Sequence, residues 1–112
     1  MRKTAAVILF LISFQTLYGD TTRILFIGNS YTEFNNLPEL FKQLSASDGK
    51  IVYTEMSAPG GYTFEGHTQL QATLDKISSR NWNYVVLQEQ SQYPSIPYYR
   101  DNSTYPSARK LD

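Results

Sequence analysis

RILFIGNSYT, residues 23–32, is the stretch of sequence that decides the fold. Four consecutive apolar residues precede Gly28, which is typical of a buried strand in a parallel sheet, because both faces of such a strand are covered. Two later runs are also interpreted as strands, Ile51 to Met56 as the second and Tyr84 to Leu87 as a third, buried one. Helical patterns separate the three runs. The order strand, helix, strand, helix, strand predicts right-handed βαβ crossovers and a parallel sheet with helices on its faces.

The two helices between the strands have recognisable boundaries. Asn36 is expected to cap the first, Pro38 falls in its first turn, and Gly49 is placed to end it. The second is expected to end near residues 79–81. One apolar stripe marks each helix, formed by Leu37, Leu40, Phe41 and Leu44 in the first and by Leu70, Leu74 and Ile77 in the second.

After the third strand the character of the sequence changes. Residues 91–106 hold three prolines and four tyrosines and are expected to form a long loop, and residues 107–112 are expected to begin another helix. Three strands make a thin sheet, and the third would lack an outer neighbour. The sequence therefore predicts a three-layer α/β/α domain over residues 20–112 that is incomplete at its C-terminus.

Composition and the first residues narrow the class of protein. The chain has 112 residues and no cysteine, which excludes disulfides, thiolate metal sites and cysteine nucleophiles. Arg2 and Lys3 followed by an apolar run predict a signal peptide over residues 1–19, too short for a stable membrane anchor, and hence a secreted or periplasmic protein. Without that segment eight basic and ten acidic residues remain. This balance does not suggest a nucleic-acid partner.

Three polar segments follow the three predicted strands, at residues 28–31, 59–63 and 88–92. Ligands of open α/β sheets bind beyond the carboxyl ends of the strands, so we expect the segments to meet in a binding site. Ser30 lies in the first of them. GNSYT is neither a G-x-S-x-G elbow nor a phosphate loop, and taken alone it favours a turn-capping role for Ser30.

In order, the three segments resemble the first three blocks of the SGNH (GDSL-type) hydrolases. ILFIGNSYT at residues 24–32 is similar to the block with the nucleophilic serine, and PGGYT at 59–63 to the block with a glycine turn. YVVLQEQSQ at 84–92 occupies the place of the third block. It lacks the G-x-N-D pattern but is similar to a glutamine-rich branch of the family. The resemblance covers roughly residues 23–94 and implies a flavodoxin-like domain.

The resemblance also implies roles for individual residues. Ser30 would be the nucleophile and, through its backbone N–H, one donor of the oxyanion hole, with the Gly61 N–H as the second donor. The family's third donor is an asparagine side chain, which a glutamine amide can replace. Gln90 is favoured for this role, with Gln92 and Gln88 as alternatives.

None of the residues named so far can act as the general base that would activate Ser30. The resemblance assigns it to an Asp-x-x-His block near the C-terminus, and residues 1–112 contain no such block. The one histidine of the sequence, His67, is a candidate base, although a lone histidine at this place is more often packed or capping.

The remaining candidates are weaker. Glu89 is expected to face away from the oxyanion site or to pair with a basic residue, of which Arg100 is nearest in sequence. Four tyrosines after the third strand are expected to cover the edge of the core, with a platform for a sugar or acyl group as the alternative. They are Tyr93, Tyr98, Tyr99 and Tyr105.

These observations together predict a secreted SGNH-type serine ester hydrolase. The resemblance suggests acyl, especially acetyl, esters of carbohydrates as substrates of the full-length protein, with no cofactor and no metal. A truncated, inactive carbohydrate-binding or non-functional fragment is the alternative. The oligomeric state is left open by the sequence.

Overall fold

The computed structural model describes residues 19–112. The signal peptide predicted for residues 1–19 therefore lies, except for Gly19, outside the described residues. No helix in the described part of the chain is long and apolar enough to cross a membrane. The elements, in chain order, are β1 (Thr22–Ile27), α1 (Ser30–Glu33), η1 (Phe34–Asn36), α2 (Leu37–Ser47), β2 (Val52–Ser57), α3 (Phe64–His67), α4 (Gln71–Ser78), β3 (Tyr84–Leu87), α5 (Pro97–Tyr99), η2 (Arg100–Thr104) and α6 (Tyr105–Leu111).

The three strands form one parallel sheet in the order β2-β1-β3. Leu25 at the middle of β1 pairs with Glu55 of β2 on one side and Val85 of β3 on the other. The central strand, β1, contains the apolar run of residues 24–27, and its Leu25 and Ile27 side chains are fully buried. The predicted parallel α/β sheet is confirmed.

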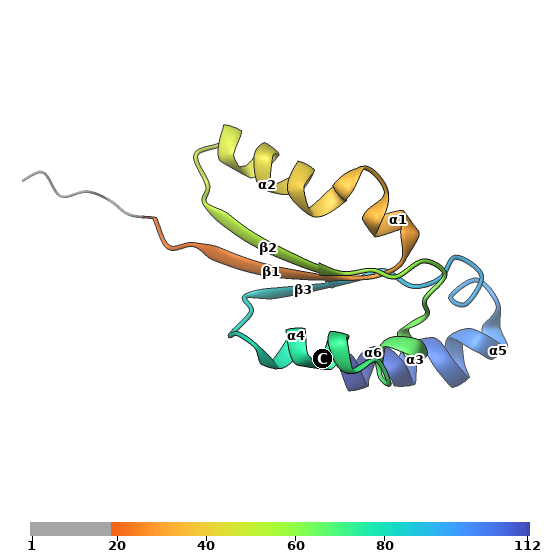
Figure 1. Cartoon of the computed structure of the whole chain (residues 1–112). Helices are drawn as coiled ribbons and strands as arrows, with labels where there is room; N and C mark the ends of the chain where they lie inside the picture. The colour runs from red at the N-terminus through yellow and green to blue at the C-terminus, as the bar shows by residue number, and fades with distance from the viewer. Residues whose placement is uncertain (1–18) are drawn as a thin grey trace, which may run out of the picture.

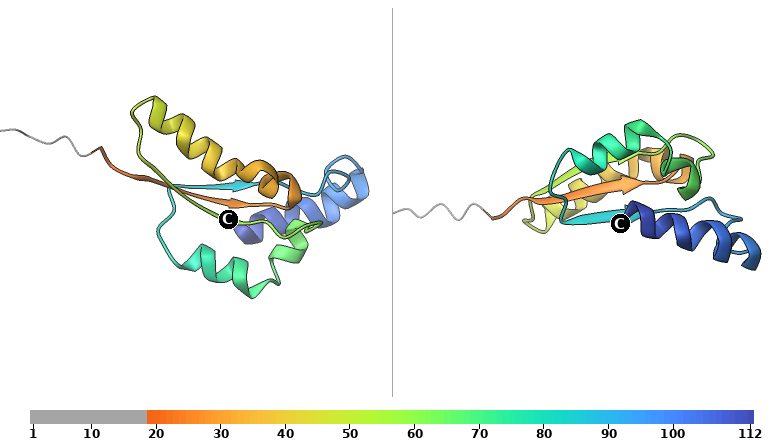
Figure 2. Two further views of the ribbon diagram at one scale, coloured as in Figure 1. Left: turned by 45° about the horizontal axis from the view of Figure 1, so that its top comes forward. Right: turned by 90° about the horizontal axis from the view of Figure 1, so that it is seen from below.

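Helices cover both faces of the sheet. Figure 1 shows α1 and α2 above it and α3, α4, α5 and α6 below it, and Figure 2 shows the same layers from two other directions. Because side chains of a strand alternate between its faces, β1 supplies both interior layers. Leu25 and Ile27 pack with Phe64 and Leu111 on the lower side. The upper cluster holds Ile24, Phe26 and Val52.

Two apolar surfaces are less covered than their patterns predict. β3 is expected to be buried, yet Val85 and Val86 are 38% and 41% exposed. The reason is that β3 pairs only with β1, so within residues 19–112 its other edge has no neighbouring strand. The stripe of α2 is likewise only partly covered, since Leu44 is 70% exposed while Phe41 contacts Phe26 edge-on.

The segment expected to be a long loop is largely helical. Residues 91–95 form turns, and α5, η2 and α6 then follow without a break from Pro97 to Leu111. Pro97 lies in the first turn of α5, where a missing N–H costs no hydrogen bond, and Pro106 is the second residue of α6, directly after η2. Prolines that suggested a loop therefore start helices. Asn36 does precede α2 as expected, but in the left-handed region and without a side-chain capping bond.

Candidate functional site

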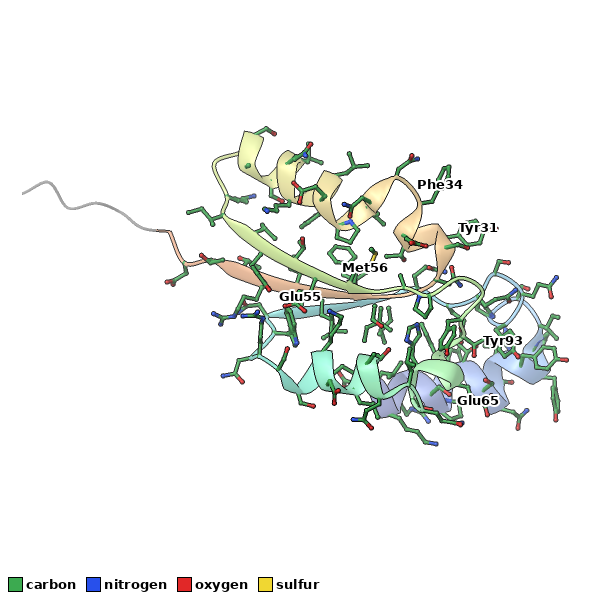
Figure 3. All side chains as sticks on the ribbon, in the orientation of Figure 1. Tyr31, Phe34, Glu55, Met56, Glu65 and Tyr93 are labelled. Atoms are coloured by element: carbon green, nitrogen blue, oxygen red, sulfur yellow. The ribbon has the colours of Figure 1, made fainter. Side chains whose placement is uncertain are left out.

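The three polar segments do meet at the carboxyl ends of the strands. The side-chain Nδ2 of Asn29 donates to the carbonyl of Tyr62 at 3.1 Å, and the backbone N–H of Asn29 donates to Oε1 of Gln88 at 3.0 Å. A buried residue after β1 thus holds the loops after β2 and β3. In Figure 3 the labelled Tyr31 and Tyr93 both lie at this end of the molecule.

The turn that presents Ser30 depends on close packing at Gly28. A Cβ at Gly28 would lie 2.4 Å from Oγ1 of Thr32 and 2.6 Å from Oε1 of Gln88, so only glycine fits there. Asn29 caps α1, because its side-chain oxygen accepts from the N–H of Tyr31 at 3.1 Å. Ser30 itself is exposed as the first residue of α1. Capping, the role that the pentapeptide alone favours for Ser30, belongs to its neighbour.

The backbone N–H groups of Ser30 and Gly61 are both free of partners within residues 19–112. Gly61 is exposed in the loop after β2 and has a φ of 72°. This left-handed conformation favours glycine. The Asn29–Tyr62 hydrogen bond joins the residue before Ser30 to the residue after Gly61, so the two N–H groups belong to adjoining loops.

The three candidate glutamines differ in what their amides do. Gln88 is engaged, because its Oε1 accepts from the N–H of Asn29 and the hydroxyl of Thr32 while its Nε2 donates to the carbonyl of Glu89. Gln90 is half-buried and uses its Oε1 to accept from the N–H of Gln92, which leaves its Nε2 uncommitted in the described chain. Gln92 is exposed. Gln88 therefore has both ends of its amide engaged, whereas the side-chain amide nitrogens of Gln90 and Gln92 donate to no partner in the described residues.

His67 is fully buried and both its ring nitrogens are occupied. Nε2 lies 2.6 Å from the carbonyl oxygen of Gly28, and Nδ1 lies 2.8 Å from Oγ1 of Thr73. A carbonyl can only accept, so Nε2 carries the hydrogen and Nδ1 accepts from Thr73. The Thr73 hydroxyl also lies 2.8 Å from Oγ of Ser57. His67 therefore supports the strand end before Ser30 from beneath.

Burial is the main influence on the titration of His67. It lowers the pKa of the imidazole below its ordinary value, against the opposing effects of the Gly28 carbonyl and the Glu89 carboxylate. Both ring nitrogens already have hydrogen-bond partners other than Ser30, so neither is free in this structure to accept the proton of its hydroxyl. The structure thus favours the packed role for His67 over the role of base.

Glu89 does not pair with Arg100, which was one of the two alternatives that the sequence offered for it. Its Oε1 accepts from the backbone N–H groups of Phe64 and Gln90, both at 2.8 Å, and its Oε2 accepts from the hydroxyl of Thr104 at 3.2 Å. Arg100 pairs with Asp101 at 3.0 Å. Since Glu89 joins the loop after β3 to α3 and η2, its function is to fasten these segments together.

Beside Ser30 lies a pocket of about 230 Å³, lined by Ser30, Tyr31 and Phe34. The two aromatic side chains are 69% and 75% exposed, and Figure 3 shows them projecting from α1 and the start of η1. Sequence reasoning missed this pocket. The signal that could have found it is the aromatic pair three residues apart, which lies on one side of a helical turn.

The tyrosines after β3 stack on one another. Tyr93 and Tyr99 have ring centroids 5.0 Å apart, and Tyr98 meets Tyr99 edge-on at 5.5 Å. Tyr98 and Tyr105 are 70% and 51% exposed. These exposures argue against the expectation that all four cover the core, and they favour the platform alternative for Tyr93, Tyr98 and Tyr99.

Within residues 19–112 no group of three His, Asp or Glu side chains is arranged to hold a metal ion. No family model, no curated protein and no solved structure matches the chain. The function is therefore inferred from the geometry of the site and from the resemblance of the three sequence segments.

Proposed function

We propose that the chain carries the nucleophile and the oxyanion donors of a secreted serine ester hydrolase of SGNH type. In this proposal Ser30 Oγ attacks the ester carbonyl. The N–H groups of Ser30 and Gly61 and the Nε2 of Gln90 donate to the oxyanion. Carbohydrate esters, acetyl esters in particular, are the substrate class that the sequence resemblance suggests, and export rests on the pattern of residues 1–19.

One observation supports the proposal above the others. An exposed serine stands at the carboxyl end of the central strand beside a pocket, and its own backbone N–H and that of Gly61 in the adjoining loop have no partner among residues 19–112. A reacting carbonyl needs these parts near one point. Asn29 and Gln88 hold the loops through partly buried hydrogen bonds, and Asn29 itself is buried, so the arrangement does not depend on surface side chains alone.

The activity of the 112-residue chain tests how Ser30 is activated. With His67 buried and bonded, residues 19–112 offer no histidine as base for Ser30. We therefore expect negligible turnover of p-nitrophenyl acetate by the 112-residue chain. Turnover that disappears in both Ser30→Ala and His67→Ala would instead make His67 the base.

A fluorophosphonate probe tests the nucleophile without requiring turnover. The Ser30 oxygen would form a bond to phosphorus, fluoride would leave, and the serine proton would pass to solvent. Oxyanion donors and substrate binding alone retain about a 10³–10⁴-fold rate advantage over water in serine hydrolases. The labelling rate of Ser30 should therefore exceed that of an ordinary exposed serine by at most about that factor. Mass spectrometry should find the adduct at Ser30, absent in Ser30→Ala and unchanged in Ser91→Ala, an exposed serine of the loop after β3. An adduct spread over several serines would refute the assignment.

A second candidate function is carbohydrate binding without hydrolysis. It is favoured by the ring cluster of Tyr93, Tyr98 and Tyr99, of which Tyr98 and Tyr99 are exposed, because a tyrosine face covers the apolar side of a sugar while its hydroxyl stays polar. Retention on an immobilised polysaccharide that is lost in Tyr98→Ala and kept in Phe34→Ala would support this function. Equal loss in both variants would contradict it.

A further inference from the structure

The aromatic pair beside Ser30 has no structural duty that explains it. Tyr31 and Phe34 are more exposed than most apolar side chains of the chain, and neither contributes to the two core clusters. Exposed aromatic surface bordering a concave site is typical of ligand binding. The hydroxyl of Ser30 is the third element of the same pocket. Any group held between the rings would therefore lie next to the candidate nucleophile.

The size and lining of the pocket restrict what it can hold. An engineered enclosed apolar cavity of roughly 150 Å³ accommodates benzene, and this open depression of about 230 Å³ has room for one six-membered aromatic ring against its exposed walls. An acetyl group would leave most of that space unfilled. Two aromatic walls offer edge-to-face or offset contacts to a flat ring, and no charged side chain lines the pocket.

We propose that Tyr31 and Phe34 bind a ring-sized apolar group of the ester, so that aryl esters are the preferred ligands of this site. The inference rests on the proposed ester hydrolase function, and it names aryl esters in place of the carbohydrate esters that the sequence resemblance suggests. The ring can belong to the acyl side, as in a benzoate, or to the alcohol side, as in a phenyl ester. Both share the same recognition chemistry, and the two can be separated by experiment.

Heteronuclear NMR on the ¹⁵N-labelled 112-residue chain tests the binding directly. Methyl benzoate and phenyl acetate are titrated as the two aryl probes, with ethyl acetate as the ringless control. We expect saturable shifts of the amides of residues 30–34 for at least one aryl ester. Its affinity should exceed that of ethyl acetate by about tenfold. The stronger of the two aryl esters shows on which side of the ester the ring lies.

Variants identify the walls of the pocket. Tyr31→Ala and Phe34→Ala should each weaken aryl binding by about fivefold or more, whereas Tyr31→Phe, which keeps the ring, should bind normally. Both residues are exposed and outside the core clusters, so truncation should leave the fold intact. Tyr98→Ala, which removes a similarly exposed ring elsewhere, is the matched control. Equal affinity for aryl and ringless esters, or shifts insensitive to Phe34→Ala, would overturn the inference.

The outcome separates this inference from the hydrolase proposal. Aryl binding is expected to persist in Ser30→Ala, because the rings remain. Aryl binding without a phosphonate adduct at Ser30 would support the aryl site and refute Ser30 as the nucleophile. An adduct at Ser30 without preference for aryl esters would support the nucleophile and refute the aryl site.

Discussion

Replacing Thr73 by valine should destabilise the domain far more than its small change in shape suggests. Thr73 is fully buried, and its hydroxyl lies 2.8 Å from both Nδ1 of His67 and Oγ of Ser57. Valine keeps the volume but removes the shared partner. The imidazole nitrogen and the Ser57 hydroxyl are then buried without that hydrogen bond, and each such group costs about 1–3 kcal/mol. The expected loss is therefore about 2–5 kcal/mol.

Thr73→Ser is the matched control for this prediction. Serine keeps the hydroxyl and removes one methyl group, which costs about 1 kcal/mol. In a domain of this size about 1 kcal/mol lowers Tm by 4–8 °C, so the valine variant should melt roughly 10 °C or more below the wild type. Circular dichroism melts of the 112-residue chains at pH 7.5 measure both. A valine variant as stable as the serine variant would refute the idea that this hydrogen-bonded chain supports the turn before Ser30.

Three further predictions follow from neighbouring contacts. Burial lowers the pKa of His67, so the unfolded chain takes up a proton more readily than the folded chain. The stability that depends on a neutral His67 is present above about pH 6.5 and should fall as the pH drops below that value. Urea titrations should therefore show a shallower loss of stability between pH 7.5 and 5.5 for His67→Gln than for the wild type. Gly28→Ala should lower the free energy of unfolding by about 1–3 kcal/mol, because its Cβ would overlap Thr32 and Gln88, whereas Gly60→Ala, where a Cβ meets nothing within 4 Å, should leave urea unfolding nearly unchanged; equal effects would contradict the packing argument. Glu89→Ala should speed amide hydrogen exchange in residues 97–104 more than Glu89→Gln does, since glutamine retains one acceptor oxygen, and identical exchange in both would show that Glu89 does not hold η2 in place.

Some features of this protein could be predicted from local pattern because they depend on near neighbours in the chain. The apolar run of β1, the turn at Gly28 and the helix that starts next to Pro38 are examples. Side-chain periodicity and backbone stiffness act over a few residues, so sequence alone indicates them. The rule that parallel strands present their carboxyl ends at one edge then placed Ser30, Gly61 and Gln90 in three neighbouring loops.

The tertiary structure decided which partner each polar group finds and how far each surface is covered. The neighbouring sequence does not show whether Gln88 or Gln90 has a free side-chain amide. In the structure Gln88 lies against Gly28 and Thr32, and its amide is hydrogen-bonded to Thr32 and to the carbonyl of Glu89. His67 could not be separated from a candidate base until its nitrogens were seen to meet Gly28 and Thr73. The valines of β3 look like core residues in sequence and are partly exposed because no strand among residues 19–112 lies beyond them. Hydrogen bonding and burial depend on distances between segments far apart in the chain, and local patterns do not encode those distances.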